Sequence, residues 1–79
     1  MQTTLDRLIE VFREVFDDEA MLITRKSSAH DFEDWDSLMH VTLMINVEKT
    51  FNVRFSSSEV AGLKDVGELI DLIEAKSRP

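Results

Sequence analysis

Residues 36–51 read DSLMHVTLMINVEKTF, and this stretch decides the fold. Its apolar side chains recur at intervals of three and four residues, the periodicity of a helix that buries part of its surface. Asp36 can cap this helix by accepting amide hydrogens that the first turn leaves unpaired. The sequence therefore predicts a helix from Asp36 to Phe51 with two rows of side chains. They are Leu38, Val41, Ile45 and Glu48, and Met44, Val47 and Phe51 with Leu43 beside them.

Upstream, the sequence predicts another amphipathic helix and then a long loop. From Thr3 to Phe16 the apolar residues fall on one face, and Thr3 with Asp6 resembles a capping box. This apolar face is narrower than that of residues 36–51, so we expect the later helix to be the more central one. Residues 17–35 lack periodicity, and we expect their polar part, residues 24–30, to be exposed. The side chains expected to pin this loop to the core are Met21, Leu22, Ile23 and Phe32.

Downstream, the pattern predicts a short helix and a final longer one. Residues 56–61 start with a Ser56–Glu59 capping box, and Gly62 is placed to stop that helix. Residues 65–76 carry apolar side chains at helical spacing after a box-like start. The expected fold is all-α. It is a single domain over residues 1–79 with three longer helices, one short helix and a long loop between the first two.

The composition excludes several classes of protein. Sixteen acidic against nine basic residues give a formal net charge of −7, which would repel nucleic acid and suits basic partner surfaces. The absence of cysteine excludes disulfides and cysteine-based metal sites. No apolar run approaches the roughly 20 residues that span a bilayer, and residues 1–10 show no secretory signal. We expect a cytoplasmic monomer without membrane insertion.

Residues at the start of the central helix raise two chemical alternatives. Ser37, His40 and Asp36 resemble the parts of a hydrolase triad, but Asp36 is better placed as a helix cap and no glycine-rich turn offers an oxyanion hole. The acidic residues at 31, 33, 34 and 36 lack the central glycine and regular offsets of a calcium loop. We therefore predict no enzyme activity and no metal site, and expect His40 to be an exposed helical residue.

Ser37 is instead placed where a phosphate group could be attached. A hydroxyl in the first turn of a helix lies at the positive end of the helix dipole, where a phosphate group is favoured. Trp35 lies two residues before Ser37, and the sequence allows two environments for its side chain. It either packs as a hydrophobic staple against a residue such as His40 or Val41, or lies exposed beside the serine.

Asp36-Ser37-Leu38 resembles the Asp-Ser-Leu motif of acyl carrier proteins and related peptidyl carrier domains. The resemblance covers nearly the whole chain. It extends through Glu48-Lys49-Thr50-Phe51 at the end of the central helix and Phe55-Ser56-Ser57-Ser58-Glu59 at the start of the short one. It continues through Leu63-Lys64-Asp65-Val66-Gly67-Glu68-Leu69 at the entry to the last helix.

The resemblance implies a carrier that is not an enzyme. A phosphopantetheinyl transferase would move 4′-phosphopantetheine from coenzyme A onto the Ser37 hydroxyl, with Asp36 near the magnesium ion of the transferase and Leu38 anchoring the helix start. Acyl-loading and acyl-transferring enzymes would then use the arm's thiol, which holds acyl groups as thioesters. Aminoacyl or peptidyl carriage is the alternative, because those domains use the same serine and fold.

The resemblance also implies two further sets of residues. An acyl chain sheltered between the helices would contact Val41, Ile45, Val60, Leu63 and Leu69. Partner recognition would involve Trp35, Met39, His40, Thr42 and Glu48. Fatty-acid-synthesis carriers usually display several acids on the central helix. Here Met39, His40, Thr42 and Lys49 occupy the corresponding positions, which favours a specialised lipid or secondary-metabolite pathway.

Overall fold

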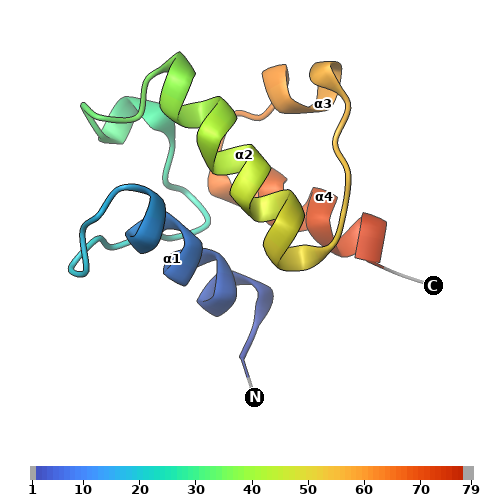
Figure 1. Ribbon diagram of the computed structural model, residues 1–79, viewed down its shortest axis with the longest axis horizontal. Coiled ribbons are helices and arrows are strands. Elements are labelled where there is room, and N and C mark those ends of the chain that lie inside the picture. The colour runs from blue at the N-terminus through green and yellow to red at the C-terminus, as the bar shows by residue number, and fades with distance from the viewer. Residues whose placement is uncertain (1, 78–79) are drawn as a thin grey trace.

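The computed structural model describes residues 2–77 and confirms the predicted all-α architecture (Figure 1). Its three longer helices are joined by a long loop and one short helix. In Figure 1, α2 crosses the middle of the molecule, with α1 and α3 on opposite sides of it. The elements are α1 (Thr4–Val15), the 3₁₀ turn η1 (Ala29–Asp31), α2 (Ser37–Phe51), α3 (Ser57–Ala61) and α4 (Val66–Ser77).

The predicted helix starts are confirmed by their hydrogen bonds. Thr3 with Asp6 and Ser56 with Glu59 form reciprocal capping boxes at the starts of α1 and α3. These pairs satisfy amide groups that a helix start leaves without intrahelical acceptors. At the other end of α2, Asn52 adopts a left-handed conformation with φ of 55° and terminates the helix.

The core is built from one of the two predicted rows of α2. Leu43, Met44 and Val47 are buried, whereas Leu38, Val41 and Ile45 are 76%, 52% and 45% exposed. The row of Leu43, Met44 and Val47 therefore joins the core with residues of α1 and α4, and the row of Leu38, Val41 and Ile45 is available to solvent. The buried apolar residues are Leu8, Val11, Phe12, Met21, Ile23, Trp35, Leu43, Met44, Val47, Val53, Val66, Leu69, Ile70 and Ile73.

The long loop between α1 and α2 is anchored differently from the prediction in two respects. Met21 and Ile23 are buried and Phe32 packs against the core, but Leu22 is 77% exposed, so its expected anchoring role is wrong. Alternation along this extended segment explains the difference, since successive side chains point to opposite sides. Ser27, expected to be exposed, is buried, and its hydroxyl accepts a hydrogen bond from the Thr24 amide.

The same loop closes the start of α4. The amides of Val66 and Gly67 donate to the carbonyl oxygens of Ser27 and Arg25 at 2.9 and 2.7 Å. A Cβ atom at Gly67 would lie 3.0 Å from the Arg25 oxygen, so a larger residue would have to push the two backbones slightly apart. The loop thus satisfies helix-start amides of α4 that have no intrahelical acceptors. No helix within residues 2–77 has the length and apolar character needed to cross a membrane.

Candidate functional site

Ser37 is the first residue of α2 and is exposed to solvent. The preceding residue, Asp36, caps the helix, because its Oδ1 accepts the amide hydrogen of Met39 at 2.9 Å. The serine hydroxyl therefore stands at a fixed helix start, where the dipole of a 15-residue helix favours an attached phosphate group.

Trp35 is buried and forms the support beneath this helix start. Its ring is 5.2 Å from that of Phe12 and 6.2 Å from that of Phe16, both in edge-on geometry. Its indole N–H donates to Nδ1 of His40 at 3.1 Å. With Asp36 as the N-cap, Trp35 at N′ and His40 at N4 occupy the two positions of a hydrophobic staple. The alternative of an exposed Trp35 is wrong, and with 7% of its surface accessible the side chain has little area to offer a partner.

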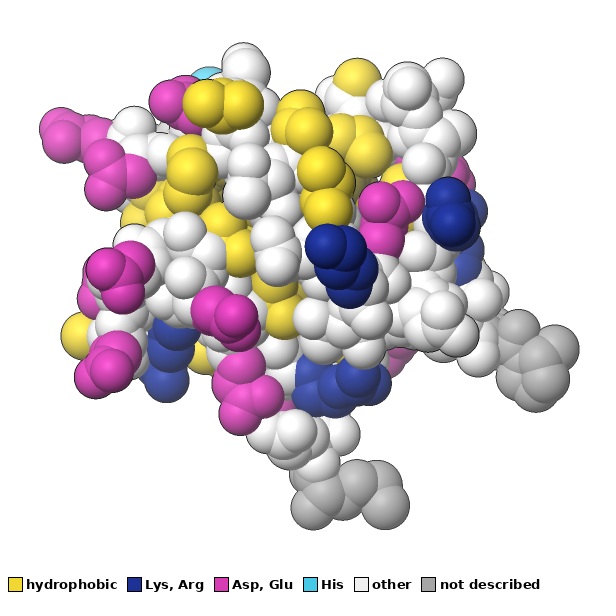
Figure 2. Space-filling view, in the orientation of Figure 1, with side chains coloured by type: hydrophobic (Ala, Val, Ile, Leu, Met, Phe, Trp, Pro, Cys, Tyr) yellow, Lys and Arg dark blue, Asp and Glu magenta, His cyan; other side chains and the backbone are white. Residues whose placement is uncertain are grey.

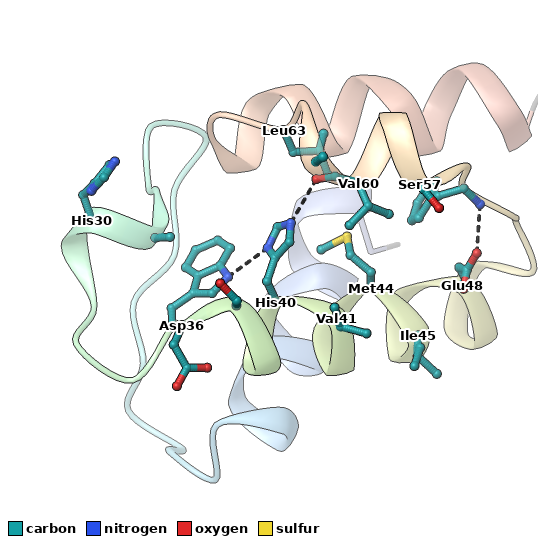
Figure 3. A pocket seen from close by; sticks show the side chains of 15 residues that line it. His30, Asp36, His40, Val41, Met44, Ile45, Glu48, Ser57, Val60 and Leu63 are labelled. Carbon is teal, nitrogen blue, oxygen red and sulfur yellow. Dashed lines mark hydrogen bonds between the residues drawn. The ribbon is translucent and has the colours of Figure 1, made fainter.

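His40 is also used internally. Its Nε2 lies 3.1 Å from the carbonyl oxygen of Val60 in α3, so the two ring nitrogens connect Trp35 to α3 (Figure 3). The expectation of an exposed histidine is wrong, because hydrogen bonds hold both nitrogens. The ring is therefore not arranged to take a proton from Ser37, and Asp36 is occupied as a helix cap. This geometry argues against the hydrolase reading.

An open groove of about 840 Å³ lies between α2 and α3, beside Ser37. Figure 3 shows Val41, Met44 and Ile45 from α2 and Val60 from α3 around it. Four of the five acyl-pocket candidates line this groove: Val41, Ile45, Val60 and Leu63. The fifth, Leu69, is buried and lines a neighbouring cavity of about 440 Å³ that also contacts Trp35 and His40.

Six groove residues escaped sequence reasoning, namely Ala29, His30, Met44, Phe55, Ser57 and Ala61. Met44 belongs to the buried row of α2, and its position predicted core packing alone. Phe55 alternates with Val53 in the connection after α2, a pattern that predicts burial but not which cavity the ring faces. Only the three-dimensional placement of α3 shows that these side chains share one groove.

The residues proposed for partner recognition lie in different environments. Thr42 is exposed, and its hydroxyl donates to the Leu38 carbonyl oxygen. Met39 is half-buried. Glu48 is half-buried, and its Oε2 accepts the amide hydrogen of Phe55 at 2.8 Å, so this carboxylate secures the segment before α3.

The exposed surface next to Ser37 is apolar. Leu38, Val41 and Ile45 follow one another along the open side of α2. Figure 2 shows hydrophobic side chains over the upper part of this face, and acidic side chains gathered at the left over the long loop. On the face shown in Figure 2, many of the acidic side chains therefore lie apart from this apolar patch.

A model of the phosphopantetheine attachment site matches residues 6–73 of this chain. The chain belongs to the phosphopantetheine-attachment family. A solution structure of a holo acyl carrier protein from Geobacter metallireducens superposes on this carrier with a TM-score of 0.87 and 43% sequence identity. That alignment covers 95% of this chain and 86% of the other.

Named acyl carrier proteins are similar over most of the carrier. The acyl carrier protein of Porphyromonas gingivalis is 35% identical over 68 residues, covering 86% of this chain and 87% of the relative. The meromycolate extension acyl carrier protein of Mycolicibacterium aurum is 30% identical over 73 residues, covering 92% and 75%. The carrier's cofactor is a covalently attached phosphopantetheine, and the carrier is not an enzyme.

The residues of this chain fit such a cofactor. Ser37 offers an exposed hydroxyl at a helix start, which suits a phosphodiester. The groove beside it is lined mainly by apolar side chains, which suits a hydrocarbon cargo.

Proposed function

We propose that this carrier holds acyl groups as thioesters on a 4′-phosphopantetheine arm attached to Ser37. The observation that carries the proposal is the exposed Ser37 hydroxyl at the capped start of α2, directly beside an apolar groove. The arm supplies a thiol, which the chain lacks because it has no cysteine. A phosphopantetheinyl transferase and acyl-processing enzymes are the partners that the family implies.

The chain's own residues then have separate tasks. Asp36 fixes the first turn of α2, so that the Ser37 hydroxyl faces solvent at a constant position. Trp35 holds that turn against α1. Val41, Ile45 and Val60 offer apolar surface that can shelter part of a hydrophobic cargo from water.

Intact-mass measurement tests the attachment. The apo chain is incubated with coenzyme A and a promiscuous phosphopantetheinyl transferase, and we expect one added phosphopantetheine per chain. Ser37→Ala should abolish the addition. Ser57→Ala is the matched control, because Ser57 is also the first residue of a capped helix and lines the same groove. An unmodified wild-type chain, or an addition that survives Ser37→Ala, would contradict the proposal.

We further propose that the carrier serves a specialised pathway and not housekeeping fatty acid synthesis. The support is that non-acidic residues stand where fatty-acid-synthesis carriers usually display acids, namely Met39, His40, Thr42 and Lys49. Beside them the row Leu38, Val41 and Ile45 exposes apolar side chains. Partners should therefore contact this side of α2 through apolar surface. Met39→Glu adds a charge beside the row and should slow acylation by the native loading enzyme.

Ala75→Glu, an equal charge at an exposed position of α4, is the control for that experiment. If Met39→Glu is acylated at the wild-type rate, the apolar contact is refuted. Aminoacyl or peptidyl carriage is the alternative cargo. The apolar lining of the groove favours acyl chains, and loading assays with acyl and aminoacyl donors decide between them. A cytoplasmic location and a monomeric state stay predictions.

A further inference from the structure

The partners of His40 fix the protonation of its ring. An indole N–H can only donate a hydrogen bond, and a backbone carbonyl can only accept one. Nδ1 faces the indole N–H of Trp35, and Nε2 faces the carbonyl oxygen of Val60, both at 3.1 Å. Only the neutral ring with its hydrogen on Nε2 satisfies both contacts. The geometry therefore requires an uncharged His40 in that tautomer.

His40 contacts α3, and this short helix buries little apolar surface. The five residues of α3 include none that is buried. Val60 packs half-buried against the core, and polar contacts add to this attachment. Lys76 of α4 pairs with Glu59 at 3.1 Å, Glu48 binds the amide of Phe55 just before the helix, and His40 binds Val60 within it. Because Val60 and Ala61 form one wall of the groove beside Ser37, the position of α3 sets the shape of that groove.

Protonation of His40 removes one of its two contacts. A hydrogen on Nδ1 would point at the indole N–H of Trp35, so that two donors would face each other at a buried position. Trp35 is held by Phe12 and Phe16 of the core and has little freedom to move. The imidazole ring must turn instead, and a turned ring no longer directs Nε2 at the Val60 oxygen. The weakly attached α3 is the element that responds.

We propose that His40 is a positioning residue that holds α3 against α2 only in its neutral form, so that acidification loosens the groove wall beside Ser37. This regulation rests on the proposed carrier function, since the groove matters only if it shelters cargo. The conformational change itself is a property of the chain and does not require the arm.

Three of the five other titratable groups near the ring are already engaged. Those lining the cavities on both sides of it are His30 from η1, Asp36 at the N-cap of α2, Glu48 from α2, and Lys64 and Asp65 from the segment before α4. The three carboxylates accept backbone amides of Met39, Phe55 and Glu68. The ion pairs found within residues 2–77, Arg25–Asp71 and Lys76–Glu59, do not involve His40. None of these contacts compensates for a charge on the imidazole.

NMR of the full apo chain tests the proposal. Long-range ¹H–¹⁵N spectra should show His40 with hydrogen on Nε2 and a bare Nδ1 near pH 8. Between about pH 8 and pH 5, the interval in which histidines change charge, the amide signals of Val60, Ala61 and Gly62 should move with the His40 ring signals. Protection of the α3 amides from hydrogen exchange, corrected for intrinsic exchange rates, should fall by about fivefold. This is the change in equilibrium constant expected when one net hydrogen bond is lost.

Two variants separate His40 from other causes. His40→Gln keeps a donor and an acceptor without titrating, so the α3 signals should lose their pH response over this interval. His30→Gln is the matched control, because His30 lines the same groove while the described hydrogen bond to the Val60 oxygen comes from His40, and the response should persist. Hydrogen on Nδ1 near pH 8, or α3 signals in the wild-type chain that ignore the His40 titration, would overturn the proposal.

The outcome is independent of arm attachment. A chain that accepts phosphopantetheine at Ser37 but shows no coupled titration refutes only the role of His40. A chain that shows the coupled titration but accepts no arm refutes the carrier function and leaves the tautomer-dependent contact standing.

Discussion

Trp35→Ala should destabilise the carrier severely, although Trp35 lies only two residues before the proposed attachment point. Its ring is 7% exposed and packs on Phe12 and Phe16 at centroid distances of 5.2 and 6.2 Å. Truncation of a buried aromatic side chain to alanine costs about 3–5 kcal/mol. It also leaves the Nδ1 acceptor of His40 without its donor.

This loss is large compared with the total free energy of unfolding of the domain. A domain of 79 residues is typically stable by about 4–12 kcal/mol, so the variant should retain at most a fraction of its stability. With a urea slope of about 1 kcal/mol per molar, the unfolding midpoint should fall by roughly 3 M or more. Trp35→Phe keeps an aromatic ring but loses the indole N–H, and should cost about 1–2 kcal/mol.

Urea unfolding followed by circular dichroism measures both variants. Leu22→Ala is the control, because Leu22 is a large apolar side chain of the same loop that is 77% exposed, and the change should stay within about 0.5 kcal/mol. A Trp35→Ala variant that unfolds within about 1 kcal/mol of the wild-type chain would refute the buried staple. It would return Trp35 to the role of an exposed partner contact.

Two further predictions concern the caps of α2 and α3. Asp36→Ala should cost about 1 kcal/mol through loss of the N-cap, measured by urea unfolding, while Asp36→Asn should keep the cap. If Asp36 also meets the transferase magnesium, Asp36→Asn should slow arm transfer without loss of stability; equal transfer rates would confine Asp36 to capping. The amide of Ser56 bonds the Glu59 carboxylate and lowers the Glu59 pKa from its ordinary 4.5. The cap therefore stabilises α3 above that value and is lost as the pH falls through the lowered pKa. A carbon-detected titration of Glu59 with a midpoint at or above 4.5 would contradict this contact.

Helix boundaries were accessible from the sequence because their signals are local. The capping residues Thr3, Asp36 and Ser56 make the predicted bonds, since each bond spans only three residues. Periodicity likewise identified the apolar rows of α2. It did not identify which row is buried, because that depends on where α1 and α4 lie. Leu22 shows the same limit in the loop, where an apolar residue between two buried ones faces solvent.

The surroundings of Ser37 depended on contacts between distant segments. The position of the serine followed from its helix and from the resemblance of the chain to carrier proteins. The contact from His40 to Val60 spans 20 residues, and no pattern in the sequence signals it. Glu48 is similar, because its spacing indicates a surface acid while its carboxylate binds the amide of Phe55. The sequence alone therefore indicates partner contacts for His40 and Glu48, whereas in the structure both side chains join α2 to the segment around α3.

Peptide mapping of the modified chain tests the central claim most directly. After reaction with coenzyme A and transferase, trypsin should release residues 27–49, a peptide that contains Ser27, Ser28 and Ser37. Fragmentation should place the whole phosphopantetheine mass on Ser37. Ser27 is buried and Ser28 is half-buried, so they serve as internal controls. Modification at either of them, or on a peptide outside residues 27–49, would contradict attachment at the start of α2.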